Sequence, residues 1–122
     1  MHLFFIQYSI HGFLLFLSIL FILEKIGPND LVGIRVGKAL RNEDNWYKVH
    51  TFAGWSIFIT SILTLLYLVT LQLFKRYYTP ELDIQPLSVT GSVISTVIGD
   101  ALIPAIYSIY MPDRSNKKTT TV

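Results

Sequence analysis

Residues 52–74 read FAGWSIFITSILTLLYLVTLQLF and contain no charged side chain. The nearest charges on either side are Lys48 and Lys75. A helix needs roughly 20 mostly apolar residues to cross the hydrocarbon core of a bilayer, and this stretch is long enough to do so. It therefore decides the fold class, and the sequence predicts an all-α protein embedded in a membrane.

Two further apolar stretches, residues 3–23 and 87–110, lie on either side of this one. Each is also long enough to cross a bilayer as a helix. We therefore predict a polytopic protein with three transmembrane helices in a single domain over residues 1–112. The first connecting loop covers residues 24–51, and the polar, Thr-rich tail over residues 113–122 is expected to be disordered.

The composition agrees with membrane insertion, since 52% of the residues are hydrophobic and only 15% are charged. A soluble domain of 122 residues needs more polar surface than this. The formal charge of +2 is too small to suggest nucleic-acid binding. The chain has no cysteine, which excludes disulfides, thiolate metal sites and cysteine nucleophiles. No cleavable signal peptide is evident, because the first apolar stretch lacks a basic region before it.

The distribution of basic residues predicts the orientation of the three spans. Three spans place the first loop and the C-terminal tail on the same side, which carries eight basic residues, whereas the other side carries two. The eight are Lys25, Arg35, Lys38, Arg41, Lys48, Arg114, Lys117 and Lys118, and the two are Lys75 and Arg76. The positive-inside rule then puts the N-terminus outside and the C-terminus in the cytoplasm.

The first loop has the residues of a shaped segment rather than of a plain linker. Gly27-Pro28 is expected to end the first helix, and Asn29 is a good capping residue for the segment after it. Arg41 to Asp44 looks like a polar turn. Asn42 or Asp44 is expected to cap a helix that runs through Trp46 and His50 into the second span.

The order and spacing of residues 29–54 resemble the signature of the SdpI-type immunity proteins. That signature has an Asn, then Gly-Ile/Tyr-Arg, a polar stretch, a Trp, an Asn or His, and a small residue before a helix. The matching positions here are Asn29, Gly33, Ile34, Arg35, Trp46, His50 and Gly54. Two departures are Val36-Gly37, where Thr-Pro is common, and the three spans, since the founding member has six. The chain resembles a short, single-module relative.

The resemblance implies a multi-pass protein of the bacterial inner (cytoplasmic) membrane. The best-understood relative protects its cell from a secreted toxic peptide and holds a transcriptional repressor at the membrane. By this resemblance we expect binding or sensing of a membrane-active peptide. Composition and spacing by themselves indicate neither activity.

Each loop residue also has a purely structural interpretation. Gly33 and Gly37 bracket Arg35, which could bind a lipid phosphate or a partner's carboxylate, or could instead hold the loop through its carbonyl groups or Asp30. His50 lies one turn after Trp46, so a ligand or proton-sensing role competes with a histidine that is hydrogen-bonded to the loop. Trp46 is most simply an interfacial anchor.

Asp100 is the most unusual residue, because a carboxylate near the middle of a span costs roughly 2.5–3.5 kcal/mol on insertion scales. It continues a polar stripe through Thr96 and lies beside a face of small residues, Gly91, Ser95 and Gly99. We predict that this helix packs against Ser56, Thr60 and Thr64, with Asp100 hydrogen-bonded to those hydroxyl groups. His11 is a second possible partner. A proton-binding or peptide-binding site and a helix-pairing role both remain open for Asp100.

Other functional classes find less support. His11 and His50 lie at different depths, so one haem is not expected to join them, and no metal or other cofactor is expected. No catalytic arrangement is recognisable, so we expect no enzyme. Two hypotheses remain: a binding protein of SdpI-like type, and a small accessory subunit of a larger respiratory or photosynthetic membrane complex. Under these hypotheses the partners of the protein would be membrane lipids and either a peptide toxin or another membrane protein. The protein would form a homo-oligomer or be part of a larger complex.

Overall fold

The computed structural model describes residues 2–29, 31–35 and 37–112. The described residues do not include Asp30 or the tail over residues 113–122. The disorder expected for the tail therefore lies outside the described residues. The described part is helical, with no strand in it, and three helical stretches are long and apolar enough to cross a membrane: His2–Ile22, Glu43–Tyr77 and Gln85–Tyr110. The protein is therefore an all-α membrane protein of three spans.

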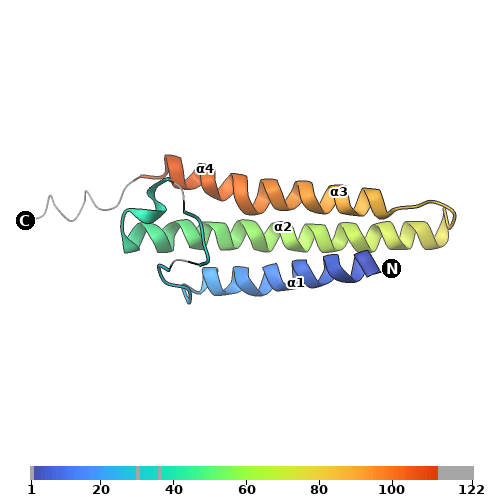
Figure 1. The fold of residues 1–122 in the computed structure, drawn as a ribbon, viewed down its shortest axis with the longest axis horizontal. Coiled ribbons are helices and arrows are strands. Elements are labelled where there is room, and N and C mark those ends of the chain that lie inside the picture. The colour runs from blue at the N-terminus through green and yellow to red at the C-terminus, as the bar shows by residue number, and fades with distance from the viewer. Residues whose placement is uncertain (1, 30, 36, 113–122) are drawn as a thin grey trace, which may run out of the picture.

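The three rods run side by side, with α2 (Glu43–Tyr77) between α1 (His2–Ile22) and the third rod (Figure 1). The third rod consists of α3 (Gln85–Ser95), the π-helical segment η2 (Thr96–Leu102) and α4 (Ile103–Tyr110). The first loop and the end of α4 lie at one end of the bundle, and the N-terminus lies at the other (Figure 1). We call the first of these the loop end.

Local sequence explains where α1 and α2 begin and end. Of the two caps that the sequence offers, Asn42 and Asp44, Asn42 is the one that caps α2, and its side chain accepts a hydrogen bond from the Asn45 amide at 2.7 Å. Helix α2 therefore starts at Glu43, so the last residues of the expected 24–51 loop are helical. Helix α1 ends at Ile22, before Gly27-Pro28, because the chain turns at Glu24, whose φ of 56° is left-handed. The expectation that Gly27-Pro28 ends this helix is wrong by about one turn.

Pro104 explains the π-helical segment in the third rod. In a regular α-helix, its ring would clash with the carbonyl of Asp100, four residues earlier. The wider turn of η2 relieves that clash, and the Ile103 N–H donates to the carbonyl of Ile98, five residues back. Asp100 thus lies in a locally widened helix, which the hydropathy of the span alone does not reveal.

The interior of the bundle is more polar than its surface. The buried residues of α1 include Gln7, His11 and Ser18, whereas Phe5 and Phe13 of the same helix are exposed. Helices in lipid pack through small and polar groups and turn apolar side chains outward, which gives this pattern. Apolar clusters close the two ends, around Phe4, Leu68 and Ile84 at one end and around Ala39, Val49 and Met111 at the loop end.

A motif loop and its cavity at the end of the bundle

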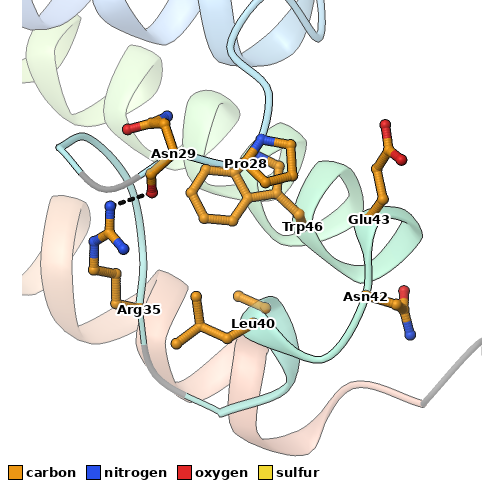
Figure 2. Close-up of a pocket in the computed structure, with 8 residues that line it drawn as sticks. Pro28, Asn29, Arg35, Leu40, Asn42, Glu43 and Trp46 are labelled. Atoms are coloured by element: carbon orange, nitrogen blue, oxygen red, sulfur yellow. Dashed lines mark hydrogen bonds between the residues drawn. The ribbon is translucent and has the colours of Figure 1, made fainter.

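Asn29 organises the first part of the loop. Its side-chain oxygen accepts hydrogen bonds from the amides of Leu31 and Val32, at 2.9 and 2.7 Å, and its side-chain nitrogen donates to the Gly27 carbonyl at 2.8 Å. This is the way in which an Asn side chain replaces a backbone turn. The Arg35 guanidinium donates to the Asn29 carbonyl (Figure 2). Arg35 therefore closes the turn by binding a loop carbonyl.

His50 fastens the loop to α2. The Ile34 amide donates to His50 Nε2 at 2.7 Å, and His50 Nδ1 lies 2.7 Å from the Trp46 carbonyl. Because Nε2 accepts, the ring is neutral, and its proton on Nδ1 donates to that carbonyl. Protonation of the second nitrogen would remove the acceptor that holds Ile34. His50 is thus hydrogen-bonded on both sides inside the fold.

Gly33 allows this close approach. Its φ of +130° is unfavourable for other residues, and a Cβ atom there would overlap the His50 imidazole and lie 2.9 Å from the Trp46 ring. Glycine at this position therefore satisfies both a backbone and a packing requirement.

Trp46 supports the same arrangement from inside the helix. Its ring stacks on His50 with centroids 3.9 Å apart, and its Nε1–H donates to the Ile26 carbonyl at 3.1 Å. Phe21 of α1 also packs against the His50 ring, with centroids 5.0 Å apart. Trp46 is 2% exposed, so it is a buried part of this end of the bundle and not the interfacial anchor that the sequence suggests.

Gly54 brings α1 and α2 together one turn further along. A Cβ atom at Gly54 would lie 2.8 Å from the Ser18 carbonyl and 2.9 Å from Ile22. The small residue at this place in the motif therefore permits close contact between the two helices.

The second half of the loop is fixed to α4 rather than to α1. The short 3₁₀ helix η1 (Gly37–Leu40) lies against α4, where the Ala39 amide donates to Ser108 Oγ at 3.1 Å. Lys38 donates to the Met111 carbonyl at 2.5 Å, and Gly37, with a φ of +65°, leaves no room for a Cβ beside Ser108. These contacts with Lys38 and Ser108 were not anticipated, because nothing in the spacing of residues links positions so far apart.

A cavity of about 430 Å³ opens beside this loop (Figure 2). It is lined by Pro28, Asn29, Arg35, Ala39, Leu40, Asn42, Glu43 and Trp46. In Figure 2 the Trp46 ring and the Arg35 and Leu40 side chains face the same space. The cavity thus offers an exposed aliphatic side chain and a guanidinium group above the buried Trp46 ring, which suits a segment that has both apolar and anionic groups.

Six residues that the sequence identifies in the signature therefore belong to one structural unit. Asn29, Gly33, Arg35, Trp46 and His50 meet in one cluster, which we call the motif loop, and Gly54 holds the helices beneath it.

The predicted packing of the second and third spans is confirmed. Thr64 and Ser95 share a hydrogen bond at 2.7 Å, and Ser56 donates to the Gly99 carbonyl at 2.5 Å. Thr60 donates to its own helix at the Ser56 carbonyl and lies so close to Gly99 that a Cβ there would overlap it. Hydroxyl groups of α2 therefore meet the small-residue face of the third rod.

The hydrogen bonding predicted for Asp100 is wrong. Both of its carboxylate oxygens are buried and have no hydrogen-bond partner among the described residues. The hydroxyl groups of α2 reach the backbone at Gly99, one residue earlier, because Gly99 is the residue that faces α2. His11 is buried as well, and its Nδ1 also lacks a partner, so the two residues form no pair. Thr96 lines a cavity near His11.

Two polar contacts of α1 were missed from the sequence. Gln7 donates to Ser88 Oγ at 3.1 Å and accepts from Ser92 at 2.9 Å, which joins α1 to α3. Tyr8 donates to Gln72 of α2 at 2.9 Å. A buried glutamine in a span has to find partners, so Gln7 itself is a signal of helix pairing that could have been used. Among the described residues, no group of three or more His, Asp or Glu side chains is placed to hold a metal ion.

The fold and the motif loop define a small multi-pass membrane protein with a folded connecting loop at one end. A comparison with protein-family models matches the SdpI/YfhL protein family over residues 25–111, and the chain belongs to that family. A search of curated proteins and a search of solved structures each found no match. The match covers the motif loop and the second and third spans.

Proposed function

We propose that the protein is an immunity-like binding protein of the bacterial inner membrane, which protects against or senses a membrane-active peptide. Membership of the SdpI/YfhL family supports the general class. The observation that carries the proposal is the motif loop itself. Its residues come from the first connecting loop and from the start of α2, and they are fastened to one another by hydrogen bonds beside one cavity.

A loop of this kind suits recognition because it is already ordered. Binding to a flexible loop requires that loop and side-chain entropy be lost on association. Here Asn29, Arg35 and His50 already fix the backbone by hydrogen bonds within the chain. A partner that enters the cavity therefore meets a preformed surface that includes Arg35 and Leu40. By the positive-inside rule we place this end of the bundle in the cytoplasm.

Protection can be tested in cells that lack the protein and are challenged with membrane-active peptides. We expect that expression of the wild-type chain restores survival. Arg35→Gln should reduce survival because it removes the cationic side of the cavity. Lys25→Gln removes a charge from an exposed residue of the same loop that does not line this cavity, and it should protect like the wild type. Equal survival with and without the wild-type protein, across the peptides tested, would contradict the proposal.

Purification in mild detergent tests whether the protein acts alone. A single or self-associated chain is expected from a binding protein of this type. Stoichiometric co-purification with redox or pigment-binding subunits would instead support an accessory subunit of a larger membrane complex.

A further inference from the structure

A cavity of about 660 Å³ lies at the end of the bundle opposite the loop end, near the N-terminus (Figure 1). The start of α1, the end of α2 and the segment that leads into α3 surround it. Its lining includes Phe4, Lys75, Arg76, Pro80, Ile84 and Gln85. It shares no lining residue with the cavity beside the motif loop, so it is a separate site.

Two neighbouring basic residues, Lys75 and Arg76, give this cavity its charge. Within the described part of the chain, neither side chain forms a hydrogen bond or an ion pair. The Arg76 guanidinium lies 5.8 Å from the centre of the Tyr77 ring, a contact that leaves its N–H donors unused. The acids that follow in the sequence, Glu81 and Asp83, do not line the cavity, and Asp83 accepts a hydrogen bond from the first backbone amide of α3. The lining is therefore cationic.

The two basic residues lie at the depth of the lipid headgroups. Lys75 follows directly after the uncharged stretch over residues 52–74, and α2 ends at Tyr77. Tyr77 and Tyr78 are both exposed, as aromatic residues are where a membrane meets water. The hydrocarbon core thus ends close to Phe74, and lipid phosphates lie level with Lys75 and Arg76.

Apolar groups adjoin these cations in the same cavity. Phe4 and Ile84 form its buried floor, where they pack with Leu68 in the apolar cluster that closes this end of the bundle. Pro80 is exposed at its edge. The volume lies within the range of roughly 300–1,000 Å³ that is usual for small-molecule sites. An anionic head joined to apolar chains matches this lining in both charge and polarity.

The charge also selects among the lipids that surround the protein. Near a membrane surface, each Lys or Arg strengthens attraction to anionic lipid about fivefold. A zwitterionic headgroup carries a positive group beside its phosphate and gains less from the two cations. Lys75 offers a point charge, and the planar fork of Arg76 can donate two hydrogen bonds to phosphate oxygens.

We propose that this cavity binds one anionic phospholipid, whose phosphate lies between Lys75 and Arg76 and whose acyl chains remain in the surrounding hydrocarbon. The site is at the opposite end of the bundle from the motif loop, so this binding is independent of the peptide protection proposed above.

Lipid preference can be measured by native mass spectrometry of the purified chain in micelles with equal amounts of dioleoyl phosphatidylglycerol and dioleoyl phosphatidylcholine. We expect one phosphatidylglycerol retained per chain, at least fivefold in preference to phosphatidylcholine. Lys75→Gln combined with Arg76→Gln should remove this preference, and it should fold because neither side chain has a bonded partner in the described part of the chain. Lys25→Gln combined with Lys48→Gln removes the same charge away from this cavity and should retain the preference.

A pair of bulky variants locates the site. Gln85→Trp adds bulk at a half-buried residue of the lining and should reduce phosphatidylglycerol retention at least fivefold. Leu82→Trp adds bulk at an exposed residue that does not line the cavity and should leave retention unchanged. The proposal is overturned if the wild-type chain retains both lipids equally, as it would if the two cations only offset the dipole of α2. It is also overturned if the two double variants retain phosphatidylglycerol equally, or if Gln85→Trp retains it like Leu82→Trp.

Discussion

The polar side chains of the motif loop differ in hydrogen bonding from the two titratable residues in the middle of the bundle, His11 and Asp100. In the motif loop, the side chains of Asn29, Trp46 and His50 all have hydrogen-bond partners within the chain. In the middle of the bundle, buried atoms of His11 and Asp100 have none among the described residues. A buried polar group with a hydrogen-bond partner is explained by its contribution to the stability of the fold. An unsatisfied group in lipid costs stability and is kept for another reason.

This difference teaches where substitutions should harm the fold and where they should improve it. Removing polar groups from the motif loop should destabilise the protein. Removing the unpartnered groups of His11 and Asp100 from the middle of the bundle should leave stability unchanged or raise it, at the expense of function. Four variants test this contrast, and each can be measured by thermal unfolding in detergent micelles.

The largest effect is expected from Gly33→Val. The new side chain would overlap His50 at a backbone φ of +130°, so we expect a loss of about 3–5 kcal/mol from strain and overpacking together. The control is Gly12→Ala, where a Cβ meets nothing within 4 Å and helix propensity improves. If Gly33→Val melted at the same temperature as Gly12→Ala, the close approach of loop and His50 would be refuted.

His50→Leu should have the next largest effect. It leaves the partly buried Ile34 amide without its acceptor and removes the stacking on Trp46, for a loss of about 2–3 kcal/mol. His50→Gln retains an acceptor oxygen at a similar reach and should recover part of this loss. Equal stability of the Leu and Gln variants would show that the hydrogen bond to Ile34 does not contribute.

Asp100→Leu should act in the opposite direction. Since the carboxylate has no partner among the described residues, its removal should raise stability by about 1–2 kcal/mol. Ser56→Ala is the matched comparison on the facing helix, and it should lower stability because it removes the hydrogen bond to the Gly99 carbonyl. A lower melting temperature for Asp100→Leu would mean that the carboxylate is bonded in the native protein. The contrast between the two regions would then fail.

The smallest effect is expected from Asn42→Ala. It removes the cap at the start of α2 and should lower stability by about 1 kcal/mol. Asn42→Ser supplies another capping side chain and should lower it less. If Asn42→Ala and Asn42→Ser were equally stable, the cap would contribute nothing measurable to the loop end.

The parts of the structure that depend on local chemistry were predictable from the sequence. Length and hydropathy give the three spans, the Asn42 cap gives the start of α2, and Ser, Thr and Gly spacing gives the packing of α2 on the third rod. The residues of the motif loop were predicted from the resemblance of residues 29–54 to a family signature. The family comparison confirms that the chain belongs to that family.

The rest depends on contacts between distant residues that no local pattern encodes. The bond between Ala39 and Ser108 joins residues 69 apart, and that between Gln7 and Ser88 joins residues 81 apart. The failed prediction for Asp100 has a similar cause. Periodicity placed it on the stripe facing α2, but the neighbouring face of Gly91, Ser95 and Gly99 is the one that contacts α2.

The central claim is that the motif loop is a folded structure fastened to α2 by His50. Its most direct test is the hydrogen-exchange rate of the Ile34 amide, measured by NMR on the protein in lipid nanodiscs. The account predicts that this amide exchanges as slowly as the helical amides near His50 and becomes fast in His50→Leu. Exchange of Ile34 at the rate of an unstructured loop in the wild-type protein, with the amides of α2 still protected, would contradict it.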